Sequence, residues 1–201
     1  MTALVDDLLD VSRLTRGLVD LDKAPLDLRH VVADAVEQVT PLIQSRRYDL
    51  ALHLPPDMMK VCGDKKRLVQ VVANILNNAA KYTHEGGNIV LRVEVLAAHV
   101  VIEITDDGIG MERDLALRAF DLFAQAERTP DRSSGGLGLG LALVKSLTEL
   151  HGGRASCKSA GLGKGSTFCI HLPRMVESKS EPDWHKNLDR DVKPEAHSLQ
   201  F

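Results

Sequence analysis

The feature that most constrains the fold is a glycine-rich stretch that leads directly into a helical pattern. Four of the six residues from 135 to 140 are glycines, and each would cost about 1 kcal/mol relative to alanine inside a helix or strand. Apolar residues then recur at helical spacing from Leu141 to Leu150. Such a loop exposes backbone N–H groups beside the positive end of a helix dipole, which suits a polyphosphate. Alone, the pattern fits a flexible loop before a helix equally well, so other motifs must decide.

Composition bounds the class of protein. The chain has 201 residues, of which 44% are hydrophobic, enough for one well-cored domain with extensions. A net charge of −3 does not favour a nucleic-acid partner, and the sequence contains no apolar run long enough to span a membrane. Cys62, Cys157 and Cys169 lie far apart, which is typical of reduced thiols in a cytoplasmic protein. The histidines do not cluster, so a metal bound by histidine or cysteine is not expected.

Three segments are predicted along the chain. Residues 1–18 read as a helix whose apolar positions alternate at spacings of four and three, from Leu4 through Leu8, Val11 and Thr15 to Leu18. This spacing is typical of the seam of a helical bundle; an ordinary amphipathic helix on its own domain is the alternative. Residues 19–173 form the predicted domain, and the polar residues 174–201 a linker or disordered end.

A second motif lies on the helix predicted over residues 65–82, which Asp64 is expected to cap. At about 100° per residue, its apolar side chains form a core face. Beside that face runs a polar stripe made of Asn74, Asn78, Lys81 and Tyr82. A solvated face explains Asn77 but not this stripe. Amide oxygens are hard ligands that suit Mg²⁺, and a lysine supplies a point charge for phosphate.

A third motif ends a hydrophobic strand. In the strand predicted from Val100 to Thr105, the inward phase continues to Asp106, and the chain then turns through Gly108 and Gly110. A carboxylate at the inward end of such a strand requires a hydrogen-bond donor, and the exocyclic amine of adenine would be one. The alternative is that Asp106 caps the short helix that starts near Glu112.

Together these motifs resemble the catalytic, ATP-binding domain of sensor histidine kinases, in the superfamily that includes gyrase, the heat-shock chaperone of about 90 kDa and the MutL mismatch-repair protein. Five segments in the expected order carry the resemblance: residues 74–83, 106–110, 120–123, 136–141 and 165–168. The resemblance implies an α/β (α+β) two-layer sandwich, in which a mixed, mainly antiparallel sheet is covered by three helices. The bundle-type helix at the N-terminus would be additional.

The resemblance also implies roles for individual residues. Asp106 would accept the adenine amine, Asn78 would hold Mg²⁺ with Asn74 assisting, Lys81 would contact the phosphates of ATP, and Tyr82 would line the pocket. Residues 124–134 would form a lid, from which Arg128 or Arg132 would reach the γ-phosphate. The remaining nucleotide-binding positions implied are Gly108, Gly110, Gly136, Leu137, Gly138, Gly140, Leu141 and Thr167.

Position 74 bears on the reaction. Hydrolysing members of the superfamily carry a glutamate four residues before the magnesium asparagine, whereas this chain carries Asn74, which cannot act as a base near neutral pH. This difference favours phosphoryl transfer over hydrolysis. Catalysis would then rest on positioning and charge stabilisation by Asn74, Asn78, Lys81 and Arg132.

One part of the family pattern is missing. None of the eight histidines has the context of the family's phosphoacceptor, which is followed by an acidic residue, leucine and a basic residue. We therefore expect a C-terminal fragment or a truncated protein, whose first helix is the end of the dimerising hairpin and a possible homodimer contact. It would phosphorylate a histidine in trans, on a hairpin of another polypeptide, for relay to a receiver-domain aspartate.

Two other functions stay open. The chain could be a regulatory module that binds ATP without transferring phosphate. It could also be an ATPase or an anti-sigma-type serine kinase. The expected location is the cytoplasm, with a parent kinase that upstream segments could attach to a membrane.

Overall fold

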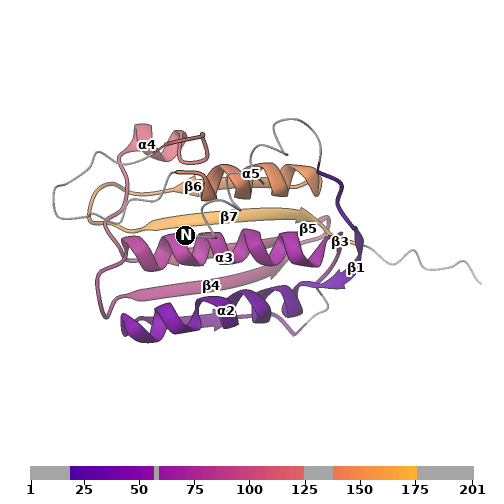
Figure 1. The fold of residues 1–201 in the computed structure, drawn as a ribbon, viewed down its shortest axis with the longest axis horizontal. Helices are drawn as coiled ribbons and strands as arrows, with labels where there is room; N and C mark the ends of the chain where they lie inside the picture. The colour runs from indigo at the N-terminus through magenta and orange to yellow at the C-terminus, as the bar shows by residue number, and fades with distance from the viewer. Residues whose placement is uncertain (1–18, 57–58, 125–137, 176–201) are drawn as a thin grey trace, which may run out of the picture.

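A computed structural model describes residues 19–56, 59–124 and 138–175 (Figure 1). The elements in chain order are β1 (Ala24–Asp27), α2 (Leu28–Ser45), β2 (Asp49–His53), β3 (Lys60–Gly63), α3 (Lys65–Tyr82), β4 (Asn88–Val95), β5 (His99–Asp106), α4 (Arg113–Leu117), α5 (Gly140–Leu150), β6 (Arg154–Lys158) and β7 (Ser166–Pro173).

The main sheet has five strands in the order β2-β4-β5-β7-β6. Only the β2–β4 pair is parallel, and the other three pairs are antiparallel. The predicted mixed, mainly antiparallel sheet is therefore confirmed. Strand β1 pairs with β3 in a separate two-stranded sheet.

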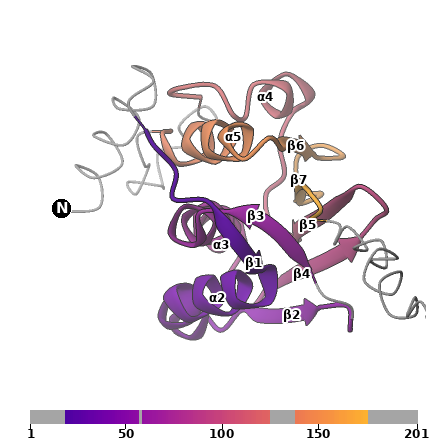
Figure 2. The ribbon, with the colours of Figure 1, turned by 90° about the vertical axis from the view of Figure 1, so that its right-hand side faces the viewer.

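Three helices cover one face of the main sheet. Figure 2 shows α5, α3 and α2 side by side on one side and the strands on the other, as the sequence predicted. Alternate residues of the central strands point toward these helices and are buried, among them Leu91, Ile102 and Ile170. Because α3 lies between α2 and α5, the side chains on its flank toward α5 lie at the boundary between α3 and α5.

Helices α2 and α3 are each capped by an aspartate, and the Asp64 cap agrees with the sequence prediction. The carboxylate of Asp27 accepts a hydrogen bond from the Arg29 N–H, and that of Asp64 accepts one from the Arg67 N–H. Helix α3 spans the predicted residues, whereas α5 begins one residue earlier than the helical pattern suggested, at Gly140. A glycine is tolerated in the first turn because that turn has no intrahelical N–H bonds to lose.

Several predicted features lie outside the described residues: the helix over residues 1–18, nearly all of the lid with Arg128 and Arg132, Gly136 and Leu137, and the tail from residue 176. Within the part of the chain that the structure describes, no helix is both long and apolar enough to cross a lipid bilayer.

Candidate nucleotide-binding site

The polar stripe on α3 has the burial that the sequence predicted. Asn74, Asn78, Lys81 and Tyr82 are all half-buried, whereas Asn77 is exposed. The Lys81 ammonium lies 4.9 Å from the centroid of the Tyr82 ring, within the range of a cation–π contact. The stripe therefore offers two amides and a cation on one line of the helix.

Asn74 marks the point where α3 meets the start of α5. Its Nδ2 donates to the carbonyl of Gly140 across 3.4 Å, so its Oδ1 is the polar atom left for a ligand. A Cβ added at Gly140 would lie 3.9 Å from the Asn74 amide, an ordinary van der Waals contact, so this helix start is in contact with Asn74 without being crowded. Asn78 lies one turn along α3, with no hydrogen bond to its side chain among the described residues.

Asp106 lies at the inward end of β5, at the other end of the stripe. Its side chain is 5% exposed and accepts a hydrogen bond from the Gly108 N–H at 2.9 Å. Burial raises the pKa of this carboxyl from 3.8 to about 6, against the Gly108 and Ser166 N–H groups, which lower it, while the Asp107 charge adds to the rise. A buried carboxylate of this kind is stabilised by a further donor. The predicted inward position of Asp106 is confirmed.

The turn after Asp106 packs closely against other backbone segments at two of its glycines. A side chain on Gly108 would overlap the Tyr82 carbonyl oxygen, and one on Gly110, which has φ +66°, would overlap that of Gly161. The Ile109 N–H donates to the Tyr82 carbonyl at 3.0 Å. These contacts hold the Asp106 turn against the C-terminal end of α3.

The site therefore extends along α3 from Asn74, at the start of α5, to Tyr82, at the Asp106 turn. Eight residues of helix correspond to about 12 Å. One end offers the start of α5 and amide oxygens, and the other offers a buried carboxylate. This arrangement suits an elongated ligand with a charged, phosphate-like end and a hydrogen-bond donor at the opposite end.

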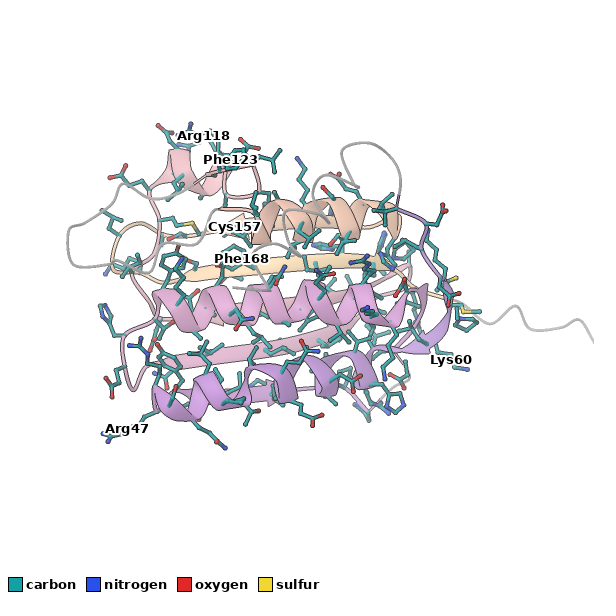
Figure 3. All side chains as sticks on the ribbon, in the orientation of Figure 1. Arg47, Lys60, Arg118, Phe123, Cys157 and Phe168 are labelled. Carbon is teal, nitrogen blue, oxygen red and sulfur yellow. The ribbon has the colours of Figure 1, made fainter. Side chains whose placement is uncertain are left out.

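Phe123 and Gly138, which flank the predicted lid, lie together beside this site. The Phe123 N–H donates to the Gly138 carbonyl at 3.3 Å, so these two residues are paired. Both have left-handed backbones, with φ of 64° for Phe123 and 72° for Gly138. Such a conformation costs a non-glycine residue about 1–2 kcal/mol, and the Phe123 side chain is still 65% exposed. Figure 3 shows Phe123 near Arg118, at the α4 end of the molecule.

Thr167 has a different partner from the one expected. Its hydroxyl lies 3.0 Å from that of Thr105, on the face of the sheet opposite to the Asp106 side chain because neighbouring residues of a strand alternate. Ser166 is the residue across from Asp106, and it is buried. The sequence held a signal for this: Ser166 shares the phase of the apolar Phe168, Ile170 and Leu172.

Asp107 is a second residue that sequence reasoning missed. Its carboxylate accepts hydrogen bonds from the Asn88 N–H at 3.0 Å and from the Asn88 side-chain amide at 2.7 Å. It thus ties the Asp106 turn to the start of β4. Because the two residues are 19 positions apart, no local sequence pattern indicates this pair.

Comparison with known proteins identifies the family. Residues 63–176 match the family described as histidine kinase-, DNA gyrase B- and HSP90-like ATPases. The chain belongs to this family. The predicted resemblance to the catalytic, ATP-binding domain of sensor histidine kinases is thereby confirmed.

Individual proteins that are similar to this chain are described as histidine kinases. The circadian input-output histidine kinase CikA of Thermosynechococcus vestitus is 33% identical over 181 residues, which are 89% of this chain and 25% of CikA. TcrY of Mycobacterium tuberculosis, described as a probable sensor histidine kinase, is 34% identical over 174 residues, 86% of this chain and 35% of TcrY. The chain thus spans only about a quarter to a third of these relatives.

Solved structures share the fold. Full-length ShkA in complex with AMPPNP superposes with a TM-score of 0.74 at 27% identity, over 87% of this chain and 36% of ShkA. The mycobacterial sensor histidine kinase MprB gives a TM-score of 0.66 at 29% identity, over 75% of this chain and 98% of the MprB chain. The predicted fold class is confirmed.

The pKa of Asp106 leads to a prediction for nucleotide binding. If only the ionised carboxylate accepts the adenine amine, ATP affinity falls as the pH drops below about 6, by about tenfold per pH unit well below the pKa. The dissociation constant measured from pH 5 to pH 8 tests this. Asp106→Asn is the control that removes the titrating group and leaves the titration of ATP itself. Equal pH profiles for the two proteins would contradict the prediction.

Proposed function

We propose that this domain transfers the γ-phosphate of Mg-ATP to a histidine on a helical hairpin outside residues 1–201, for relay to a receiver-domain aspartate. The observation that carries the proposal is the single line from Asp106 along α3 to the start of α5. In this proposal Asp106 binds the adenine amine, with Gly108 and Gly110 shaping the turn, and Tyr82 lines the pocket. Lys81 and the backbone amides of residues 136–141 bind the phosphates.

The donor set fits a magnesium ion bound together with phosphates. Asn78, assisted by the Oδ1 of Asn74, would hold Mg²⁺ through neutral amide oxygens, which leave several coordination positions for phosphate and water. When bound, the ion would supply charge neutralisation between the phosphates. Lys81, one turn from Asn78, adds a fixed positive charge on the same stripe.

The proposal assigns the rest of the predicted site by family resemblance. Arg128 or Arg132 would reach the γ-phosphate from the lid. Thr167 is not assigned to the adenine end, because its side chain lies with that of Thr105 on the face of the sheet opposite to Asp106. The working location would be the cytoplasm, with dimerisation through residues 1–18. Asn74 supports transfer over hydrolysis, because an amide cannot deprotonate a water molecule.

A transfer assay with a matched pair of variants tests the function. The chain is incubated with γ-labelled ATP and Mg²⁺, with and without separately made acceptor hairpins, and label is followed on protein and as free phosphate. We expect acid-labile label on a hairpin and little free phosphate without one. Asn78→Ala should lower transfer by about 100-fold or more, in the range seen when one transition-state electrostatic group is lost. Asn77→Ala, one residue away but exposed, should leave it unchanged.

Other results would support the rival functions. Bound ATP with no transfer to any hairpin would indicate a non-catalytic regulatory module. Fast release of free phosphate without a hairpin would indicate an ATPase, and acid-stable label on a serine would indicate a serine kinase. Equal loss of activity in Asn77→Ala and Asn78→Ala would contradict the assigned stripe.

A further inference from the structure

A polar cluster lies at the end of α5 remote from the candidate nucleotide site. We call it the connector latch, and it consists of Asp22, Lys23, Asp64 and His151. Lys23 and Asp22 belong to the segment that precedes β1, Asp64 caps α3, and His151 follows the last residue of α5. In Figure 1 the indigo segment that leads into β1 passes this end of α5.

His151 is the centre of the connector latch. Its side chain is 5% exposed. Its Nδ1 lies 2.7 Å from the carbonyl oxygen of Leu147, so Nδ1 carries the proton, and Nε2 accepts a hydrogen bond from the Asp64 N–H at 2.9 Å. The ring packs so closely on Gly63 that a side chain there would lie 2.8 Å from it. One neutral imidazole thus joins the end of α5 to the start of α3.

The segment before β1 is attached to the same two helix ends. The Lys23 ammonium donates to the carbonyl of Leu150 at 2.7 Å, where a cation also complements the negative end of the α5 dipole. The Asp22 N–H donates to the second carboxylate oxygen of Asp64 at 3.2 Å, while the first oxygen caps α3. The segment therefore contacts the ends of both helices through polar groups.

Helices α3 and α5 are antiparallel, and two side-chain hydrogen bonds between described residues tie them together at different ends of α5. The connector latch joins Asp64 to His151, and the Asn74 amide joins Gly140. The latter bond, at 3.4 Å, is long and therefore weak, so the connector latch is the stronger of these two polar contacts. Apolar side chains of both helices also pack in the common core, and a change at the latch end of α5 is transmitted along the helix to its start, beside the polar stripe.

We infer that the connector latch couples the segment before β1 to the nucleotide site, with His151 as a positioning residue. A displacement of this segment that breaks the Lys23–Leu150 contact shifts α5, and the start of α5 then fits the phosphates less well. The inference rests on the proposed nucleotide site. It assigns to His151 a role in affinity and not in chemistry.

The charged groups that face His151 give the latch a pH signature. They are Lys23, from the segment before β1, and Asp64, from the start of α3. Burial lowers the pKa of His151 from 6.5, and Lys23 lowers it further, against the Leu147 carbonyl and Asp64. Protonation would remove the acceptor for the Asp64 N–H. The latch therefore contributes its full stability above pH 6.5, and this contribution is lost as the pH falls through the lowered pKa.

The test uses variants at two positions and a lysine control. Lys23→Met removes the contact to α5 without touching the core, and Lys66→Met changes an exposed lysine in the first turn of α3. His151→Leu removes the Nε2 acceptor, whereas His151→Gln keeps an acceptor atom. ATP affinity is measured for each variant, and the pKa of His151 is measured by NMR titration in the proteins that retain it.

We expect Lys23→Met to raise the pKa of His151 and to weaken ATP binding by about three- to tenfold, in the usual range of coupling effects. Lys66→Met should do neither. His151→Leu should weaken ATP binding at least as much as Lys23→Met, and His151→Gln should weaken it less. The double variant should bind ATP about as weakly as His151→Leu alone, because both substitutions break one network. If the wild type binds ATP and Lys23→Met binds it equally tightly, the coupling inference is wrong, whereas the proposed function is unaffected. Failure of the wild type to bind ATP would overturn the proposed function as well.

Discussion

Asp106→Asn is expected to abolish most of the ATP affinity while leaving the domain folded. The asparagine Oδ1 can still accept the Gly108 N–H, so the turn is kept. Its other group is an NH₂, which would face the adenine amine donor to donor. Loss of a buried hydrogen bond to a charged group costs about 1.5–3 kcal/mol, which is about a 10- to 150-fold rise in the dissociation constant. Titration calorimetry at pH 7.5 measures it.

The control for this substitution is Asp107→Asn in the same turn. Asp107 is exposed and bonds to Asn88, and an asparagine keeps one of these two bonds. We expect ATP affinity at pH 7.5 to be unchanged in Asp107→Asn. Equal affinity of wild type and Asp106→Asn would show that Asp106 does not bind adenine.

Asp106→Asn should also stabilise the nucleotide-free domain. A folded-state pKa of about 6, compared with 3.8, means that the buried carboxylate is destabilising above pH 6. This group contributes stability below pH 3.8 that is lost as the pH rises through 6. Removing the charge should therefore raise the stability at pH 7.5, by less than the roughly 3 kcal/mol that the pKa change represents, because the amide offers one acceptor oxygen to the Gly108 and Ser166 N–H groups where the carboxylate offers two. A higher melting temperature together with weaker ATP binding would show that the carboxylate is kept for its ligand.

Gly165→Ala is expected to be the most damaging of the small substitutions in this domain. Gly165 has φ +65°, and its N–H donates to the Gly108 carbonyl at 3.1 Å. An added Cβ would overlap the carbonyl of Asp106 and lie 3.0 Å from the Cα of Asp107. The clash involves backbone on both sides, so no side-chain rotation relieves it. We expect a loss of about 3 kcal/mol or more in the free energy of unfolding.

Gly163→Ala supplies the matched control two residues away. Gly163 has nearly the same backbone, with φ +71°, but an added Cβ there would meet no atom within 4 Å. The left-handed backbone of an alanine at this position should by itself lower the free energy of unfolding by about 1–2 kcal/mol. Urea unfolding of both variants separates the two contributions. Equal destabilisation would show that close packing against the Asp106 turn is unimportant.

Local patterns were enough to predict the elements that carry the site. The 3.6-residue period gave α3 with its half-buried stripe, and the alternation of β5 gave the inward Asp106, because each depends only on residues that are neighbours in sequence. The Asp64 cap was predictable for the same reason. The alternation of β7 also indicated Ser166 as the inward residue, although the family resemblance directed attention to Thr167.

Features that depend on strand pairing could not be predicted in this way. The Asp107–Asn88 pair and the close approach of Gly165 to Asp106 arise only when β4, β5 and β7 are aligned. The pairing of β1 with β3 and the burial of His151 against Asp64 likewise join residues far apart in the chain. Nothing in the local sequence of His151 indicates a partner 87 positions away.

The most direct test of the account is a crystal structure of the chain with Mg²⁺ and a non-hydrolysable ATP analogue. We predict that the adenine amine lies within hydrogen-bond distance of the Asp106 carboxylate and that the phosphates lie at the start of α5. The metal ion should lie about 2.1 Å from the Asn78 amide oxygen. A nucleotide bound elsewhere, or one bound along α3 with its adenine away from Asp106, would contradict it.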